Sequence, residues 1–576
     1  MKLRRFDKNA SSFKNSLNHK KDTYIKYGTL IFSFAVIVFI YVYFTRAAFN
    51  SNTDFSVINA SVGDFVTDYT LSYYLDNTLV NNAPTPTDDV AFDHVTCDKN
   101  ATATFDKGEW AASISATEQG TKCKVYFVTD NNAWQLPGGV DLETGMTAIK
   151  YVDGKIYKAD TSQKWYDYRN HEWANAAILT STGAAKTTEE LDPTTDIYQM
   201  YVWIPRYAYK TWDIVDGSSE EHIIPIIFQS ATTKNNSEGY ITHPAFKFGQ
   251  TELNGFWVGK FETATNTGIW TSDNNDFCTS IGCANAANII IKPNVISLTN
   301  INIANMFNAS RSIESNFDLT SADIDTHMMK NMEWGSIAYL SNSRYGIYNY
   351  DETCSNPNQV VNGKCIIFVN NVNVGYGAGT NTYNLTYQWG PTVTGCSAAG
   401  VNTGVANATT QTNPTCANNY TWKENGARAS TTGNMYGVYD MSGGAWEYVM
   451  GNMANSTTTY SYNAKSSGLT TQPEDKYYDK YLAIALDTTT MSDDNQSKVQ
   501  NRGLIGDATY EVMKTYGSLT GGWNSDYAVF VSSSRPWFSR GGHANNGSYA
   551  GVFAFHRHDG GRNTAYSFRV VLTKEG

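Results

Sequence analysis

The sequence predicts an α+β fold class for most of this 576-residue chain, preceded by a transmembrane helix and a small all-β module. Three observations predict it. An uncharged apolar run occupies residues 27–44, and short runs rich in β-branched and aromatic residues recur between 46 and 131. After residue 197, strand-like runs occur together with two segments of helical periodicity. A chain of this length is expected to hold about two to four domains.

The N-terminus predicts a membrane anchor. Residues 1–26 form a basic tail, and residues 27–45 are long and apolar enough to cross a bilayer. Positive charge before the apolar run predicts a single-pass protein in the cell membrane, with a cytoplasmic N-terminus and extracellular C-terminal domains. A cleaved signal peptide is the alternative, but Arg46 makes Thr45–Ala48 a poor cleavage site.

The charge balance argues against a nucleic-acid partner. The net charge is −11 and the pI is about 5.4, whereas binding to nucleic acid needs a basic surface. Charged residues make up only 17% of the chain, and Tyr and Gly are abundant, with 38 and 45 copies. Such a composition is typical of β-rich extracellular domains with long loops.

Two small modules are expected before residue 197. Residues 46–131 resemble a β-sandwich-like module, because short strand-like runs are separated by Asn, Asp, Gly and Pro. Residues 132–196 are expected to form a small β-rich module and linker. Asp153-Gly154 predicts a hairpin there, and Pro193 falls in the polar linker.

The eight cysteines predict disulfides, which an oxidising exterior permits. No C-x-x-C motif occurs and no histidine lies at ligand spacing, so disulfides are favoured over a metal. Pairing in sequence order is the simplest connectivity, although others remain open. It would join Cys97–Cys123, Cys278–Cys283, Cys354–Cys365 and Cys396–Cys416.

Residues 197–576 are expected to form the main domain, with insertions at about 270–295 and 341–430. Strands are predicted at 200–210 and 255–267, and helices at 301–313 and 326–340. Asp325 or Thr326 is positioned to cap the second helix. The methionines of both helices are predicted to be core residues.

The motif YGVYDMSGGAWEYVMGN, residues 436–452, resembles a signature of the formylglycine-generating enzyme, or sulfatase-modifying, family. The elements Arg540-Gly541-Gly542 and Ser567-Phe568-Arg569-Val570 resemble that family's second hallmark. The resemblance covers roughly residues 197–574 and implies a C-type-lectin-like fold. It also implies that Asp440 and Glu447 are structural hydrogen-bond partners rather than a general acid and base.

The oxidase branch of this family binds copper through a pair of cysteines near the terminal strand. This sequence has no cysteine after Cys416. We therefore expect no enzyme activity, no metal and no cofactor, and keep a formylglycine-generating-type oxidase or a relative as an alternative.

The C-terminal stretch, residues 532–572, is most similar to the variable regions of proteins diversified by retroelements. In those proteins the variable region forms a hypervariable ligand-binding surface. Adenine-directed mutation of Asn codons yields the residue types found between the apolar frame positions. We therefore expect these residues to form a binding site: His543, Ala544, Asn545, Asn546, Tyr549, His556, His558, Gly560, Arg562, Asn563, Ala565 and Tyr566.

Six of these side chains should be exposed on one contiguous face: His543, Tyr549, His556, His558, Arg562 and Tyr566. Trp523, Asp526 and Trp537 are candidate supports of that face, although burial in the core is the ordinary expectation for tryptophan. His556 and His558 have the strand spacing to share a metal, but no further ligand beyond Asp559 is evident.

Together these features predict a surface-displayed protein that binds a protein or glycan ligand through a diversified C-terminal site. Tyr and His offer contact area at small entropic cost, and Asn, Ser and Gly adapt hydrogen bonds. An adhesin of fixed specificity is a further alternative.

Overall fold

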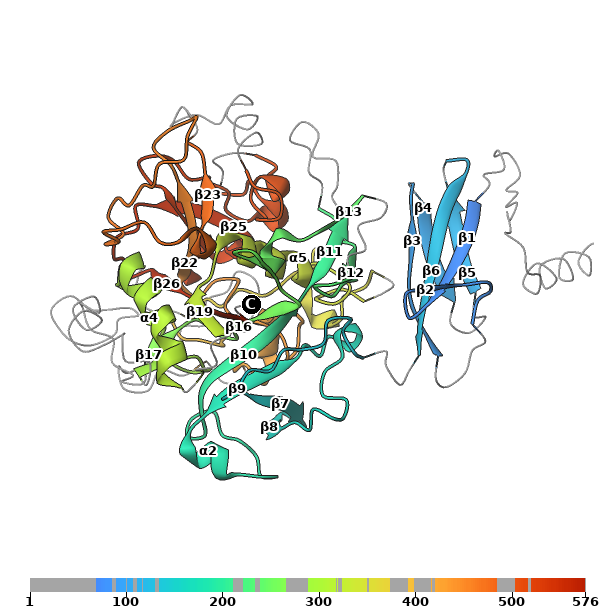
Figure 1. The fold of residues 1–576 in the computed structure, drawn as a ribbon, viewed down its shortest axis with the longest axis horizontal. Helices are drawn as coiled ribbons and strands as arrows, with labels where there is room; N and C mark the ends of the chain where they lie inside the picture. Colours follow the sequence, from blue (N-terminus) through green and yellow to red (C-terminus); the bar gives the residue numbers. More distant parts are fainter. Residues whose placement is uncertain are drawn as a thin grey trace, which may run out of the picture. The chain divides into compact units, whose positions relative to one another are not determined.

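The structure is a computed structural model that describes residues 69–84, 90–99, 101–106, 111–116, 118–129, 134–210, 221–233, 239–265, 288–317, 319, 324–349, 352–372, 392–397, 416, 420–483, 503–515 and 519–574. Contacts divide the chain into two compact units, Met1–Ala133 and Trp134–Gly576. Figure 1 shows the elements of each.

The first unit contains a four-stranded sheet and a separate two-stranded one. The sheet has the order β2-β1-β6-β3, with β1 and β6 parallel, and β4 pairs with β5. The two sheets are in contact through three aromatic rings, those of Phe92, Phe105 and Phe127. The strands are β1 (Tyr69–Leu75), β2 (Thr78–Val80), β3 (Val90–Cys97), β4 (Ala101–Asp106), β5 (Ala111–Ala116) and β6 (Thr121–Thr129).

The second unit is built on a seven-stranded sheet in the order β19-β27-β16-β10-β9-β7-β8. The last strand of the chain, β27, lies between β19 and β16 and is antiparallel to both. The strands are β7 (Thr147–Val152), β8 (Lys155–Lys158), β9 (Asn175–Leu179), β10 (Ile197–Pro205), β16 (Gly255–Gly259), β19 (Ile324–Met328) and β27 (Val570–Lys574).

A five-stranded sheet carries most of the C-terminal segment. Its order is β23-β22-β24-β25, and β26 pairs with β22. The strands are β22 (Trp446–Met453), β23 (Asp479–Tyr481), β24 (Trp537–Gly541), β25 (Gly551–His558) and β26 (Tyr566–Phe568).

Smaller elements complete the second unit. β11 (Tyr207–Lys210) pairs with β12 (Ile226–Phe228) and β13 (Tyr240–Thr242). Two-stranded pairs are β14 (Lys247–Phe248) with β15 (Thr251–Glu252), β17 (Ala264–Thr265) with β18 (Ile289–Ile290), and β20 (Val360–Val361) with β21 (Lys364–Cys365). The α-helices described are α2 (Ser181–Ala185), α4 (Ile303–Asn316) and α5 (Asn331–Ser341).

The predicted α+β class is wrong, because the described residues are mostly β-sheet, with 37% in strands and 16% in helices. Many strands are only two to five residues long and lie in stretches whose composition resembles loops. Their pairing depends on distant partners, which local sequence patterns do not reveal. The helical pattern is therefore a poor guide to the class of this fold.

The transmembrane helix and the single-pass membrane localisation are corrected as well. No helix among the described residues is long and apolar enough to cross a membrane. The predicted anchor at 27–45 and the basic tail at 1–26 lie outside the described residues.

The predicted module at 132–196 is not separate from the main domain. β7 and β9 pair, and β9 pairs with β10, so residues 134–196 contribute three strands to the large sheet. The hairpin expected at Asp153-Gly154 is present between β7 and β8, and both residues have positive φ. The polar stretch after residue 179 contains the short helix α2 rather than an unstructured linker.

The second predicted helix begins later than expected. Residues 324–328 form β19, which pairs with β27 along its whole length, and α5 starts at Asn331. Asp325 and Thr326 therefore do not cap it. The N-cap is Lys330, whose backbone N–H donates to Glu333. Tertiary strand pairing overrides the helical periodicity of the sequence here.

The first predicted helix is present as α4, whose N-cap side chain, Asn302, accepts from the backbone of Asn305. Met306, Met328 and Met332 are buried, as expected of core residues.

Three of the predicted disulfides are present: Cys97–Cys123, Cys354–Cys365 and Cys396–Cys416. Cys278 and Cys283 lie outside the described residues. The first bridge joins directly opposed residues of the neighbouring strands β3 and β6, rather than two layers of a sandwich.

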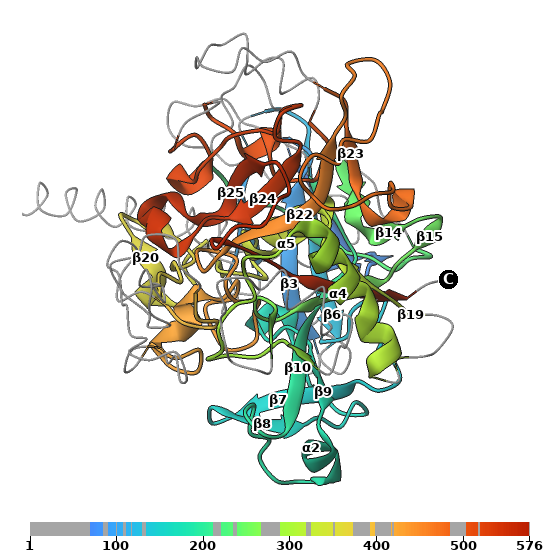
Figure 2. The same cartoon turned by 90° about the vertical axis from the view of Figure 1, so that its left-hand side faces the viewer.

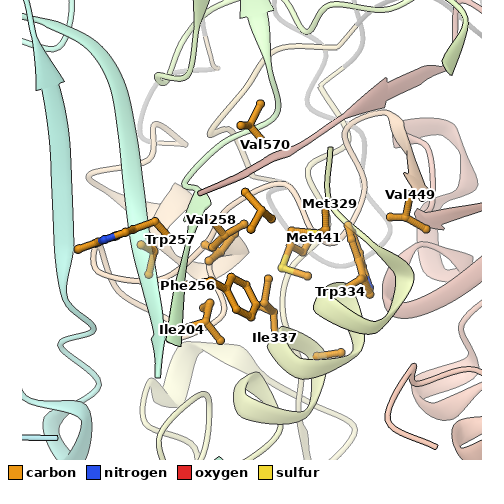
Figure 3. Packing of buried hydrophobic residues seen from close by; sticks show 14 of the residues in the cluster. Ile204, Phe256, Trp257, Val258, Met329, Trp334, Ile337, Met441, Val449 and Val570 are labelled. Atoms are coloured by element: carbon orange, nitrogen blue, oxygen red, sulfur yellow. The ribbon is translucent and has the colours of Figure 1, made fainter. Parts of the chain in front are cut away.

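The core of the second unit forms around α5, all of whose residues are buried. Trp334 and Ile337 of this helix point toward Phe256 of β16 and Met441 (Figure 3). The segment before the helix contacts β22, since Met450 N donates to Met329 O, and α5 lies beside β22 in Figure 2. The helix thus connects the two large sheets.

A buried charged cluster holds β19 against α5. His327 lies between Asp325 and Glu333, with its ring nitrogens 2.9 and 3.1 Å from carboxylate oxygens. Burial alone would lower the pKa of His327, but the charge of Glu333 and the hydrogen bonds to both carboxylates outweigh it and raise the pKa. Burial acts to raise the pKa values of Asp325 and Glu333, but His327 and nearby cations lower them.

We expect the stability contributed by charged His327 to be fully present below pH 6.5, its unfolded pKa, and to be lost as pH rises through the raised folded value. The free energy of unfolding lost in His327→Gln should therefore be larger at pH 6 than at pH 9. Urea titrations of both proteins at these pH values measure it. A loss that grows from pH 6 to pH 9 would contradict a charged His327.

Candidate ligand-binding face

One face of the five-stranded sheet gathers aromatic rings and imidazoles from four segments. His556 and His558 alternate along β25, so both project from the same face of the sheet. Ser539 of β24 lies opposite His556, and Tyr448 of β22 lies opposite Ser539. We call this set the aromatic face: Trp446, Tyr448, Tyr527, His556, His558 and Tyr566.

The small side chain of Ser539 lets the rings on either side of β24 meet above it. The ring of His556 lies 5.5 Å from Trp446 and 5.1 Å from Tyr527. The ring of His558 lies 4.7 Å from Tyr566. The aromatic face is therefore one continuous packed layer rather than a row of independent side chains.

Hydrogen bonds fix the orientation of His558. Its Nδ1 meets the hydroxyl of Tyr448 and lies 2.9 Å from a carboxylate oxygen of Asp559. The Tyr448 hydroxyl also donates to the carbonyl of Gly561 at 2.9 Å. Asp559 in turn accepts from Ser466 at 2.8 Å and from Gly561 N at 3.0 Å. The imidazole is thus held in place by its neighbours in the fold.

Both histidines are held in their neutral forms. Burial and, to a smaller extent, the nearby cations Arg557 and Arg535 lower the pKa of His556 to about 3. Burial also lowers the pKa of His558, and Asp559 offsets only part of that effect. A neutral imidazole offers both a donor and an acceptor nitrogen.

Arg535 and Arg557 lie near the aromatic face, although Arg557 alternates with His556 and His558 along β25 and so projects from the opposite face of the sheet. Arg535 and Arg562 are exposed, and both Arg535 and Arg557 influence the ionisation of Tyr527. Nε and Nη1 of Arg557 have no hydrogen-bond partner among the described residues. The surroundings are therefore cationic, with Asp559 as the carboxylate next to His558.

Only part of the predicted site is accessible. Asn545 and Arg562 are exposed, and Asn546, Tyr549, His556, His558 and Asn563 are half-buried. The prediction of six exposed side chains is wrong for His543, which is fully buried, and for Tyr566, which is 5% exposed. Ala544, Gly560 and Ala565 are buried as well.

Several of the predicted site positions have structural roles. His543 and Asn546 cap the short 3-10 helix Ala544–Tyr549: Asn545 N donates to His543 Nδ1, and His543 N donates to Asn546 Oδ1. Gly560 has a φ of 89°, and a methyl group there would lie 2.7 Å from the Trp537 ring. Asn563 Oδ1 accepts from Ala565 N.

The two candidate tryptophan supports are core residues. Trp523 is fully buried, 5.3 Å from the Phe553 ring, and Trp537 donates its indole N–H to Ala464 O. Asp526 is 3% exposed and accepts from Phe553 N, away from the aromatic face.

Three members of the aromatic face were not predicted from the sequence: Trp446, Tyr448 and Tyr527. The first two flank Glu447 in the motif WEY, and this alternation would have placed both on one side of the strand. Tyr527 reaches the face because Phe555 N donates to Tyr527 O, an irregular pairing at the edge of the sheet. No local sequence pattern indicates that contact.

Asp440 and Glu447 belong to a buried network rather than to this face. Glu447 accepts from Arg569, and Asp440 accepts from Asn370 at 2.9 Å and from Gly395 N at 2.9 Å. Asp440, Glu447, Asn370 and Arg569 are all buried.

Comparison with known proteins assigns no family to this chain. No protein-family model matches the chain, and no curated protein matches it.

Proposed function

We propose that this chain is a ligand-binding protein whose site is the aromatic face together with the exposed residues beside it, and that the segment carrying the site is diversified. The single observation that carries the proposal is the partly exposed layer of His556, His558 and Tyr527 on a buried sheet. Variable contact residues on a rigid support are the arrangement that antibody paratopes use.

The rigidity of the support favours binding over a purely structural role. β22 and β24 are buried throughout, and residues 551–555 of β25 are buried on both faces. The strand leaves the core only at its last three residues, His556, Arg557 and His558, which are half-buried. Side chains at this end can change with little effect on the core.

The chemistry of the face indicates the class of ligand. The rings that reach the surface, those of Tyr527, His556 and His558, suit the apolar faces of sugars or aromatic side chains. The exposed guanidinium of Arg535, close enough to lower the pKa values of both histidines, suits hydroxyl, carbonyl or carboxylate acceptors. A protein or a glycan offers both, so we retain these two ligand classes.

Diversification is tested on the DNA that surrounds the gene. We expect an imperfect repeat of the bases encoding Ser532–Leu572 that differs where the template has adenine, and a reverse-transcriptase gene nearby. The repeat should differ at the codons for Tyr549, His556, His558 and Arg562. If no such repeat exists, the proposal that this segment is diversified is wrong. Binding by the aromatic face is tested separately with a display library.

A further inference from the structure

A pocket at the other end of β25 contains a buried carboxyl group that the aromatic face does not use. It has a volume of about 40 Å³, room for a few water-sized groups. Its lining is Ser341, Asn342, Ile347, Ile366, Ile367, Val369, Asn524, Asp526, Ser548, Ala550, Gly551 and Val552. Gly551 and His558 are seven residues apart on β25, which is roughly 20 Å in a strand, so the pocket is distinct from the aromatic face.

Asp526 is fixed in position by the backbone around it. Its Oδ2 accepts from Phe553 N at 3.0 Å, and no other described residue donates to this side chain. Its own backbone N–H donates to Trp523 O, and its carbonyl accepts from Gly522 N. A methyl group at Gly551 would lie 2.1 Å from both carboxylate oxygens, so the carboxyl group packs directly against a position that must be glycine.

The turn before Asp526 is unusual. Asn524 and Ser525 both have left-handed backbones, with φ of 56° and 68°. Two consecutive non-glycine residues in this region cost free energy, and the surrounding fold must impose the conformation. The turn directs Asn524 and Asp526 to the same pocket.

The lining combines acceptor groups with an apolar wall. Asp526, Asn524, Asn342 and Ser548 all carry oxygen acceptors, whereas no lysine or arginine lines the pocket. Three isoleucines and two valines form the apolar wall. A carboxyl group with neighbouring oxygen acceptors at the end of an apolar pocket matches an ammonium group on an alkyl chain.

We propose that this pocket binds a primary ammonium group at the end of a short alkyl chain, with Asp526 as the counter-ion. The chemistry is shared by a lysine side chain of a partner protein and by a free alkylamine. Both would place the ammonium against Asp526 and the alkyl chain against Ile367, Val369 and Val552.

Binding should release a proton. Burial raises the pKa of Asp526 well above its ordinary value; Glu221 raises it further, while Phe553 N, Arg540 and Lys514 lower it. A raised pKa favours the protonated carboxyl group, and an arriving ammonium favours its ionised form.

The test uses the full chain and calorimetric titration with n-butylammonium, in two buffers of different ionisation enthalpy. The expected result is saturable binding with proton release, and at least about tenfold weaker binding of n-butanol, which has the same shape without the charge. Nα-acetyl-lysine methylamide distinguishes the sources: binding as tight as butylammonium indicates a lysine side chain, and much weaker binding indicates a free amine.

Two variants of the pocket and one control variant keep the result interpretable. Asp526→Asn retains an acceptor for Phe553 N and should weaken butylammonium binding about tenfold or more. Ser548→Phe fills the pocket from its half-buried rim and should abolish binding while Asp526 remains. Asp559→Asn, at the aromatic face, should leave binding unchanged. Equal binding of butanol, or unchanged binding in Asp526→Asn, would overturn the proposal, whatever the outcome for the aromatic face.

Discussion

Replacing Arg569 by methionine is expected to lower the free energy of unfolding by about 3 kcal/mol or more at pH 8. The guanidinium donates to both carboxylate oxygens of Glu447, to Gly259 O at 2.7 Å and to Tyr439 O at 2.9 Å. These partners belong to both large sheets and to the motif segment, and Arg569 is fully buried. Its loss leaves two carbonyls and a carboxylate without their donor.

The loss in Arg569→Met should be smaller at pH 5 than at pH 8. Burial raises the pKa of Glu447 to about 7 even beside Arg569, and removing the cation raises it further. Both folded proteins therefore lose stability as pH rises from about 4.5 to about 7, but only the variant continues to lose it above about 7, so the difference between the two proteins is larger at pH 8.

Unfolding of Arg569→Met in guanidinium chloride, measured at pH 5 and at pH 8, checks this expectation. Arg562→Met, at an exposed position, is the matched control and should change stability by less than about 0.5 kcal/mol. A loss of that small size in Arg569→Met would show that the guanidinium does not connect the sheets.

The second large effect is expected for Lys260→Met, a loss of about 2–4 kcal/mol. Lys260 is fully buried and donates to Asn175 Oδ1 at 2.8 Å, Met435 O at 2.6 Å and Gly437 O at 2.9 Å. Its Nζ also lies over the rings of Tyr151 and Tyr439. Methionine fills the same volume but donates no hydrogen bond, so the variant leaves buried acceptors unpaired.

Thermal unfolding of Lys260→Met measures the effect, and Lys574→Met at the exposed end of β27 is the matched control. Burial lowers the pKa of Lys260 well below its ordinary value. Three donated hydrogen bonds require the three N–H groups of the ammonium form, so the loss includes both hydrogen bonding and charge. If the two variants lose the same stability, the three hydrogen bonds contribute nothing net.

Local sequence patterns predicted the features that depend on neighbouring residues. The three described disulfides match the pairs that lie close in sequence, and the hairpin at Asp153-Gly154 follows from the backbone preference of glycine. Burial of the methionines around α4 and α5 followed from their helical spacing.

Features that depend on distant partners were not predicted. β19 is a strand because β27 pairs with it from the far end of the chain, and residues 134–196 join the large sheet through β9 and β10. The candidate site was only partly accurate for the same reason. His543 serves as a cap and Tyr566 packs against Tyr448, so both are buried despite their polar groups.

The central claim is that the exposed residues of the binding face can be replaced without unfolding the protein, because a buried sheet supports them. A display library of the full chain tests this claim most directly. The library varies Asn545, Tyr549, His556, His558 and Arg562, and is selected for binding to an arbitrary folded protein and to a glycan array. A matched library varies the buried frame residues Val552, Phe553, Phe555, Phe568 and Val570. We predict that most face variants fold and that binders are recovered from the face library alone. Unfolding of most face variants, or binders that keep their affinity when the original face residues are restored, would contradict the claim.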